Sequence, residues 1–223
     1  MIIDYRLYKH INILIERYPK LGVIRQDIIN AYIIMEQSYL KGGKLLIAGN
    51  GGSAADSEHM AGELMKCFKI PRPIKKEFTD KLRLIDPIRG ERLSKNLECS
   101  LMAIPLVAHE ALTTAYINDV DDLSIFAQQL YGFGKPGDVF LGISTSGNSE
   151  NIIHAAVAAH ALQIKVIALT GIDGGELAKM ANVCVKAPDS ETYRIQEYHL
   201  PIYHCWCLML EDRFFNRHFS DEY

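Results

Sequence analysis

The sequence predicts an α/β fold in which helices cover both faces of a parallel sheet. From residue 44 onward, short apolar runs alternate with helix-like segments, which is the element order of a doubly wound sandwich. Two of these runs, "VFLGIS" and "VIALT", are apolar throughout, as strands are when both faces of a parallel sheet are buried. Two strands are followed by turns rich in glycine or serine that open helices, "GNGGSAA" and "STSGNSENI".

Two helices are expected before the first strand, over residues 4–18 and 24–41, with Pro19 and Gly22 between them. Apolar side chains in the second helix recur at helical spacing and form one stripe: Ile24, Ile28, Ile29, Tyr32 and Met35. We therefore expect residues 1–42 to form an N-terminal helical arm that packs on the domain or in an oligomer. Residues 43–223 would form the main domain.

The remaining elements follow from hydrophobic pattern and turn residues. Strands are expected at 44–48, 101–107, 138–144, 165–170 and 182–187. Helices are expected at 53–67, 109–115, 122–131, 148–162, 175–180 and 191–215. Residues 68–98 interrupt this alternation, because they are charged and contain three prolines. We interpret them as an inserted surface segment with one short helix near residues 75–84.

Composition excludes several classes of protein. The 223 residues are 48% apolar and 23% charged, as in a soluble globular protein, and the net charge of −3 argues against a general nucleic-acid surface. No apolar run reaches the roughly 20 residues of a membrane span, and the N-terminus has helical spacing, unlike a signal peptide. The five cysteines form no CxxC pair, which favours free thiols in a reducing cytoplasm: Cys67, Cys99, Cys184, Cys205 and Cys207.

The second turn has the composition of a phosphate site. It offers four hydroxyl groups and no lysine, from Ser144, Thr145, Ser146 and Ser149. It also opens a helix, whose free N–H groups and dipole favour an anion, and Gly147 allows close approach of the backbone. These features predict a phosphate monoester held by neutral donors. The alternative is that the polar residues serve only as helix caps.

The first turn allows a competing interpretation. Gly49, Gly51 and Ala54 match the dinucleotide-binding pattern GxGxxA after a strand. That pattern also requires an acidic residue at the end of a second strand about 20 residues later. The corresponding stretch, "FKIPRPIKKEF", does not have the pattern of a strand, so dinucleotide binding is the weaker hypothesis.

Four polar residues on two expected helices could carry chemistry. His59 and Glu63 are four residues apart and share one helix face, and Gln196 and His204 are eight apart on the last helix. Two imidazoles, a carboxylate and an amide could bind a divalent metal. Alternatively, Glu63 could be a general base and His204 a general acid. Either histidine could also be purely structural, and the sequence does not show that the two helices meet.

Four segments together resemble the phosphoheptose isomerases, a branch of the sugar isomerase (SIS) domain proteins: "GNGGSAADSEHMAGEL", "ISTSGNSENI", "ALTGIDGGEL" and "YRIQEYHLPIYH". The resemblance covers about residues 30–215. It implies a five-stranded parallel sheet in an SIS-type three-layer sandwich, a homotetramer with active sites at subunit interfaces, and isomerisation of sedoheptulose 7-phosphate to a glycero-manno-heptose 7-phosphate.

The resemblance also implies roles for individual residues. The phosphate would be held by Ser144, Thr145, Ser146 and Ser149. The sugar would contact Asn50, Gly51, Gly52, Ser53, Asn118, Asp119 and Gln196. The zinc-ligand positions of the family fall on His59, Glu63, Gln196 and His204, and Glu63 and His204 would act as base and acid.

The chain departs from the family pattern in three places. Ala48 stands where a cysteine is common, Tyr193 stands where an acidic residue precedes the Arg-Ile-Gln motif, and the 68–98 segment is longer than in the shortest members. The alternatives are a non-catalytic phosphosugar-binding or regulatory SIS protein, such as one that binds a replication initiator, or an isomerase or lyase for another phosphosugar. A binding protein is expected to lose the acid–base residues, which this chain keeps, so the sequence favours an enzyme.

Overall fold

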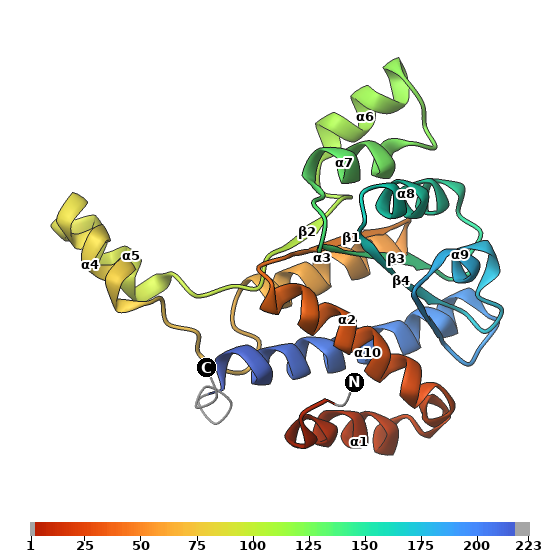
Figure 1. Cartoon of the computed structure of the whole chain (residues 1–223), viewed down its shortest axis with the longest axis horizontal. Coiled ribbons are helices and arrows are strands. Elements are labelled where there is room, and N and C mark those ends of the chain that lie inside the picture. The colour runs from red at the N-terminus through yellow and green to blue at the C-terminus, as the bar shows by residue number, and fades with distance from the viewer. Residues whose placement is uncertain (1–2, 217–223) are drawn as a thin grey trace.

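The computed structural model describes residues 3–216 and contains the predicted parallel sheet (Figure 1). Its five strands lie in the order β2-β1-β3-β4-β5, and all neighbouring strands are parallel. The strands are β1 (Leu45–Gly49), β2 (Ala103–Pro105), β3 (Val139–Ser144), β4 (Lys165–Thr170) and β5 (Val183–Lys186). The α/β fold class with a five-stranded sheet is thereby confirmed.

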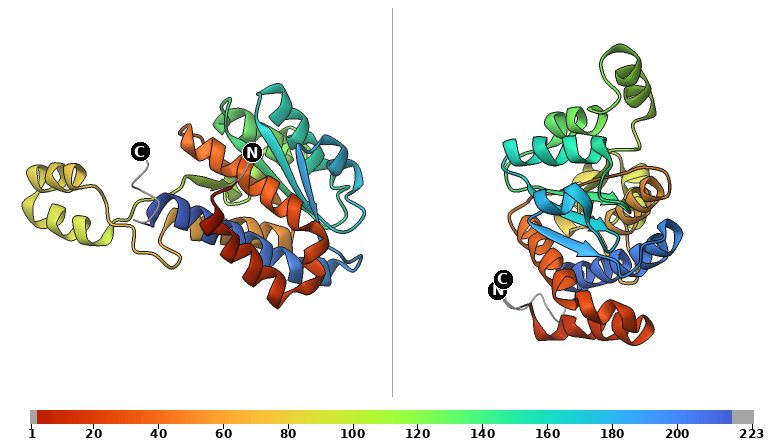
Figure 2. Two further views of the ribbon diagram at one scale, coloured as in Figure 1. Left: turned by 60° about the horizontal axis from the view of Figure 1, so that its bottom comes forward. Right: turned by 90° about the vertical axis from the view of Figure 1, so that its right-hand side faces the viewer.

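Helices cover both faces of the sheet, as the two views in Figure 2 show. The core on one face includes α2 (Arg25–Leu40), α3 (Gly52–Met65) and α10 (Thr192–Phe215), and α1 (Tyr8–Arg17) extends this core by packing on α10. The other packs on α7 (Ile125–Phe133), α8 (Glu150–Ala161) and α9 (Gly175–Met180). Alternate residues of β1 serve the two cores: Leu45 and Ile47 face the first, and Leu46 and Ala48 the second.

The N-terminal helices pack against the last helix of the chain. A short turn of 3₁₀ helix, Tyr5–Leu7, precedes α1, and a second, Pro19–Ile24, connects α1 to α2. The fully buried Trp206 donates its indole N–H to the carbonyl of Ile28, at 2.9 Å. His10 contacts the carboxylate of Asp212 at 2.7 Å. The separation of an arm at 1–42 from a domain at 43–223 stays a prediction.

Residues 68–98 contain two helices where the sequence suggested one. Helices α4 (Lys76–Ile85) and α5 (Pro87–Asn96) form an antiparallel hairpin that projects from the body (Figures 1 and 2). The missed helix α5 had a signal: Asp86 caps it by accepting from the backbone N–H groups of Ile88 and Arg89, and Pro87 occupies its first turn.

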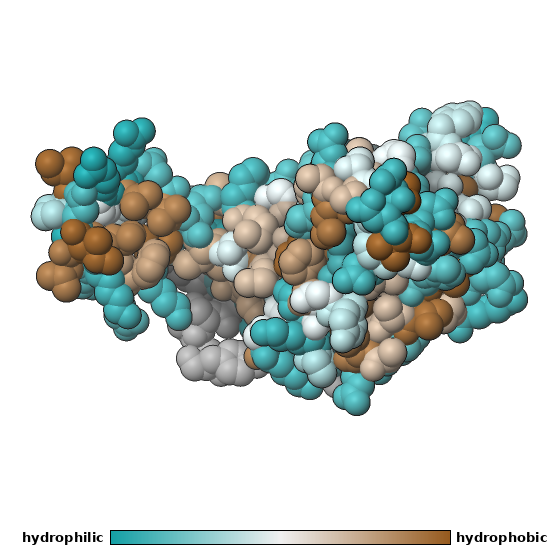
Figure 3. All heavy atoms as spheres, turned by 90° about the horizontal axis from the view of Figure 1, so that it is seen from above, coloured by the Kyte–Doolittle hydropathy of each residue, from teal (hydrophilic) through white to brown (hydrophobic). Residues whose placement is uncertain are grey.

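The hairpin exposes much of its apolar surface. Apolar side chains gather on the projecting end of the molecule in Figure 3, and those at least 40% exposed are Phe78, Leu84, Ile85, Ile88, Leu93 and Leu97. At its base, a single antiparallel bridge pairs Pro73 with Glu98 and brings the two ends of the segment together. The hairpin is thus joined to the body at one narrow point.

The other predicted elements lie close to their expected positions. Each strand from β1 to β5 overlaps its predicted range, and β4 and α9 match theirs at both ends. Helix α6 (Glu110–Asp119) extends four residues beyond the expected end at 115. Within the described residues, no helix is long and apolar enough to cross a membrane.

Candidate active site

The two glycine- and serine-rich turns lie side by side at the carboxyl edge of the sheet. Strands β1 and β3 are neighbours, so the turns that follow them emerge next to each other. The side-chain amides of Asn50 and Asn151 donate to each other, with N···O distances of 2.9 and 3.0 Å. This reciprocal pair joins the start of α3 to the start of α8, and sequence analysis had not singled out Asn151.

Internal hydrogen bonds shape the serine turn. The buried hydroxyl of Ser144 lies 3.0 Å from that of Ser149 and accepts from the backbone N–H of Gly147. Gly147 has a φ of +69°, and a Cβ there would lie 2.0 Å from the carbonyl oxygen of Gly174. The turn therefore requires glycine at this position, both for its conformation and for its close packing.

A small cavity of about 210 Å³ lies beside this turn. Thr145 and Ser146 line it together with residues of the loops that follow β4 and β5. The hydroxyls of Ser144 and Ser149 are directed at each other. The four predicted phosphate ligands are therefore close together in the structure, but two of them serve the turn itself.

The last helix meets the first turn through Gln196. A Cβ on Gly52 would lie 2.6 Å from Nε2 of Gln196, so the amide side chain lies directly against the first residue of α3. Ser53 follows, buried, with its backbone N–H donating to the carbonyl of Asn50. Helices α3 and α10 thus meet at the glycine turn, which the sequence could not show.

His59, Glu63 and His204 lie further along the same two helices. His59 Nε2 is 3.4 Å from Glu63 Oε1, and the rings of His59 and His204 lie edge-to-face with centroids 5.0 Å apart. Lys66 Nζ lies 3.4 Å from the other oxygen of Glu63. His204 Nε2 is buried without a hydrogen-bond partner in the structure. The predicted acid, His204, and the predicted base, Glu63, are therefore both neighbours of His59.

Tyr203 and Asp56, which were not selected from the sequence, complete this cluster. The Tyr203 hydroxyl lies 3.0 Å from Nδ1 of His59 and 3.3 Å from Oδ1 of Asp56. Tyr203 is buried, and its ring packs edge-to-face on both His59 and His204. Tyr203 directly precedes His204, and Asp56 lies about one helical turn before His59. Spacing along the sequence alone gave no reason to select either residue.

The cluster is electrostatically perturbed. Burial raises the pKa of Asp56 to about 6, against the opposing effects of the Tyr203 hydrogen bond and of His59. Burial also lowers the pKa of His204, and the neighbouring His59 lowers it further, while Glu63 acts in the opposite direction. Perturbed groups of this kind cluster at functional sites.

The side chains of His59, Glu63, Gln196 and His204 are of types that can bind zinc, although they are not gathered around one point in the structure. Within residues 3–216, no three His, Cys, Asp or Glu side chains come close enough together to hold an ion. Two imidazoles, a carboxylate and an amide oxygen are nevertheless ligands that zinc accepts. The Nε2 atom of His204, which is buried and has no hydrogen-bond partner, is also a free ligand atom beside the other residues.

Asn118 and Asp119 lie elsewhere. They are exposed at the end of α6, and the hydrogen bond found there joins them to each other, from Asn118 Nδ2 to Asp119 Oδ1 at 2.7 Å. Helix α6 packs on α7 and has no buried residue. The dinucleotide hypothesis also lacks support, because α4 and α5 occupy the segment where it needs a second strand.

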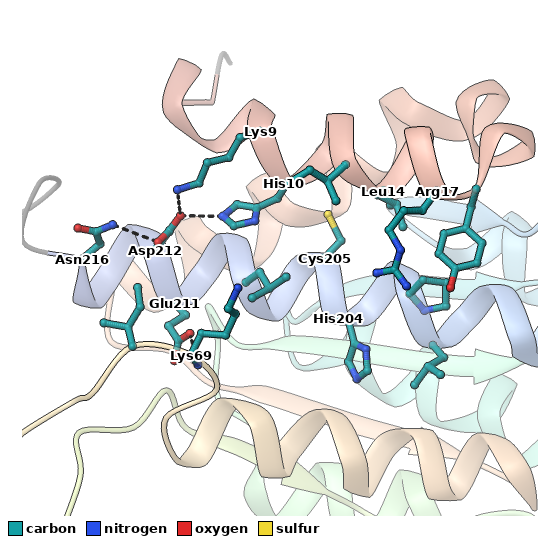
Figure 4. Close-up of a pocket in the computed structure, with 16 residues that line it drawn as sticks. Lys9, His10, Leu14, Arg17, Lys69, His204, Cys205, Glu211, Asp212 and Asn216 are labelled. Atoms are coloured by element: carbon teal, nitrogen blue, oxygen red, sulfur yellow. Dashed lines mark hydrogen bonds and ion pairs between the residues drawn. The ribbon is translucent and has the colours of Figure 1, made fainter.

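The larger cavity, about 680 Å³, lies between α1, α10 and the loop around residue 69. In Figure 4, Lys9, His10 and Arg17 reach into this region from α1, while His204 lies on the side of α10 that faces α3. Of the predicted catalytic and ligand residues, only His204 lines this cavity among the residues described.

Comparisons with known proteins identify the family of the chain. The SIS domain family matches residues 91–171. The phosphoheptose isomerase of Thiobacillus denitrificans is 40% identical over 177 residues, which cover 78% of this chain and 77% of that protein. The chain belongs to the phosphoheptose isomerase family. It is therefore one of the aldose–ketose isomerases.

Solved structures of phosphoheptose isomerases have the same fold. The protein from Neisseria gonorrhoeae is 33% identical and superposes with a TM-score of 0.71 over 93% of this chain and 97% of its own. That from Francisella tularensis is also 33% identical, with a TM-score of 0.69 and coverage of 84% and 86%. The resemblance inferred from the four sequence segments is thus confirmed at the level of family and fold.

Proposed function

We propose that this phosphoheptose isomerase converts sedoheptulose 7-phosphate into D-glycero-D-manno-heptose 7-phosphate. The observation that carries the proposal is the meeting of α3 and α10, which places Glu63, His59 and His204 together within a family of aldose–ketose isomerases. Such a reaction needs a base at carbon and an acid at oxygen within reach of one substrate.

The sugar phosphate would lie along the carboxyl edge of the sheet. Thr145 and Ser146, with the first N–H groups of α8, would bind the phosphate, and Ser144 and Ser149 would hold the turn in shape. Asn50, Gly51, Gly52, Ser53 and Gln196 would contact the sugar. Asn118 and Asp119 lie on α6, apart from these residues. They would complete the binding site only if α6 approached it.

The isomerisation needs two proton carriers, a base and an acid. The Glu63 carboxylate would remove a proton from C1 of the ketose, while His204 donates one to the carbonyl oxygen at C2, giving an enediol. Glu63 would then return its proton to C2, and His204 would take the proton from the oxygen at C1. The net change moves one hydrogen from C1 to C2 and leaves an aldehyde at C1.

A zinc ion, held by His59, Glu63, Gln196 and His204, is part of the proposal. When bound, it would supply a Lewis acid that polarises the carbonyl. The choice of donors and the free Nε2 of His204 support it. Because the side chains do not converge in the structure, binding requires them to turn.

We further propose that the enzyme is a homotetramer located in the cytoplasm. The five free cysteines agree with a reducing compartment, and the exposed hairpin leaves apolar surface for contact between copies.

Proton exchange followed by NMR tests the proposal directly. Purified protein is incubated with sedoheptulose 7-phosphate in heavy water, with chelator or with added zinc. The expected result is an aldose carrying deuterium at C2, formed more slowly after chelation. Exchange without a new aldose would indicate another phosphosugar substrate. Tight binding without exchange under every metal condition would overturn the proposal in favour of a binding or regulatory protein.

A further inference from the structure

We infer that Tyr203 and Asp56 are positioning residues that hold His59 in the tautomer whose Nε2 is free to bind metal. This inference rests on the proposed function, because it concerns the zinc ligand set. Tyr203 and Asp56 would act through His59 and would not themselves be metal ligands. The hydrogen bond that reaches His59 comes from Tyr203 on α10, 144 positions away in the sequence.

The geometry forms a chain of three groups. Tyr203 on α10 places its hydroxyl between Asp56 Oδ1 at 3.3 Å and His59 Nδ1 at 3.0 Å, both on α3. Tyr203 is 1% exposed, so water does not compete for its hydroxyl. The second oxygen of Asp56 is buried without a hydrogen-bond partner, which leaves Tyr203 as the main support of this carboxylate.

Counting protons fixes the direction of the chain. A tyrosine hydroxyl has one hydrogen to donate, and a carboxylate can only accept. If Tyr203 donates to Asp56, its oxygen must accept the hydrogen on His59 Nδ1. The neutral imidazole then carries no hydrogen on Nε2, because only one of its two nitrogens is protonated.

The free lone pair of His59 faces the candidate metal site. Nε2 lies 3.4 Å from Oε1 of Glu63, so two acceptors confront each other in this tautomer. The side chain of His59 is 45% exposed, so a metal ion can reach this pair of acceptors, and a cation there would stabilise it. The arrangement matches the known habit of metal-bound histidines, whose second nitrogen donates to a fixed oxygen acceptor.

The tyrosine ring also packs against both imidazoles. Its centroid lies 5.6 Å from that of His59 and 5.1 Å from that of His204, with interplanar angles of 77° and 82°. Replacement by phenylalanine keeps these edge-to-face contacts and removes only the hydroxyl. Tyr203→Phe therefore separates the hydrogen bond from the packing.

The experiment measures zinc affinity and tautomer without turnover. Zinc dissociation constants are obtained by competition with a chromophoric chelator, and the tautomer of His59 by ¹⁵N NMR of the metal-free protein. Tyr203→Phe is expected to weaken zinc binding 10- to 100-fold and to lose the Nδ1–H tautomer. Asp56→Asn should do the same, because an amide donating to Tyr203 redirects the tyrosine hydrogen to Nδ1.

Tyr39→Phe is the matched control. It also removes one hydroxyl hydrogen bond, from Tyr39 to the carbonyl of Met102 at 3.1 Å, and should leave zinc affinity and tautomer unchanged. Wild-type affinity in both test variants, or no zinc binding by the parent protein, overturns the inference. If the parent binds zinc with the expected tautomer but does not isomerise the sugar, the proposed function fails and the inference stands.

Discussion

Glu63 is the residue on which the proposed chemistry depends most. Its carboxylate lies between His59 and Lys66, on the helix face that meets α10. Glu63→Gln keeps the shape but cannot accept a proton, so we expect kcat to fall about 10²- to 10⁴-fold while the sugar phosphate still binds. Steady-state kinetics and calorimetric titration of the substrate measure the two effects.

Glu58→Gln is the control for that variant, because Glu58 lies on the same helix and is exposed. Its kcat should stay close to that of the parent protein. Full activity in Glu63→Gln would remove this residue from the reaction.

His199 makes the stability of the fold depend on pH. It is fully buried, with Nε2 3.2 Å from the carbonyl of Thr170 and Nδ1 without a partner, and burial lowers its pKa to about 4. An unfolded histidine titrates near 6.5, so as pH falls from about 6.5 to 4 only the unfolded state gains the proton. This residue should therefore remove roughly 3 kcal/mol of stability over that range.

His199→Gln lacks this titration, and its amide can still donate to Thr170. Urea unfolding at several pH values between 7 and 4 should show a shallower loss of stability in the variant. Parallel losses in both proteins would show that other groups are responsible.

At this scale the sequence located the candidate residues but not the side chains that hold them in place. His59, Glu63, Gln196 and His204 could be selected by residue type and spacing along a helix. Asp56 and Tyr203 could not, because they are 147 positions apart and become partners only when α3 and α10 pack together. Asn151 was missed for the same reason, since its partner Asn50 is 101 positions away.

Among the elements, the loop after α3 is fastened by a buried ion pair. Arg72 and Glu211 are each 1% exposed, and Glu211 also accepts from the backbone N–H groups of Phe68 and Lys69. Arg72 in turn donates to the carbonyls of Leu64 and Glu63 at the end of α3. The pair thereby ties the helix that carries Glu63 to the helix that carries His204.

Breaking this pair should destabilise the whole fold. Arg72→Met leaves Glu211 buried without its cation, a change that typically costs about 3–5 kcal/mol. Arg89→Met removes an arginine whose side chain is 83% exposed and paired with Asp86, and should cost less than about 1 kcal/mol. Chemical unfolding of the two variants distinguishes these cases, and similar values for both would contradict the role of Arg72.

On the scale of the whole molecule, the hairpin is structurally separable. No residue of α4 is buried, and Gly90 is the one buried residue of α5. Pro73 and Glu98 are already paired, so an Asn-Gly turn could replace residues 74–97. We expect the isolated shortened subunit to unfold cooperatively, with a free energy of unfolding within about 1 kcal/mol of that of the isolated full chain, since contacts between copies contribute separately.

Denaturant unfolding followed by circular dichroism measures this free energy. Loss of the cooperative transition would show that the hairpin is part of the fold. Replacing the exposed Leu84 and Ile85 by serine in the full chain is the control, since it changes the hairpin surface and leaves the connection intact.

The overall architecture was within reach of the sequence because its signals are local. Apolar strands such as "VFLGIS" and the turns after them predict a buried parallel sheet without knowledge of distant contacts. The hairpin was only half predicted, because the strong surface charge of 68–98 obscured the capping signal at Asp86 and Pro87. The positions of Asn118 and Asp119 depend on how α6 sits on α7, which no pattern within α6 determines.

The packing of α10 has a consequence for folding during synthesis on the ribosome. This last helix contacts α1, α2 and α3, and its Trp206 binds the carbonyl of Ile28 near the start of the chain. The core on that face of the sheet can close only after α10 has been synthesised and has left the ribosome. Until then the nascent chain has its glycine and serine turns but not Gln196 and His204, so the candidate site forms only once α10 is available to pack on α3.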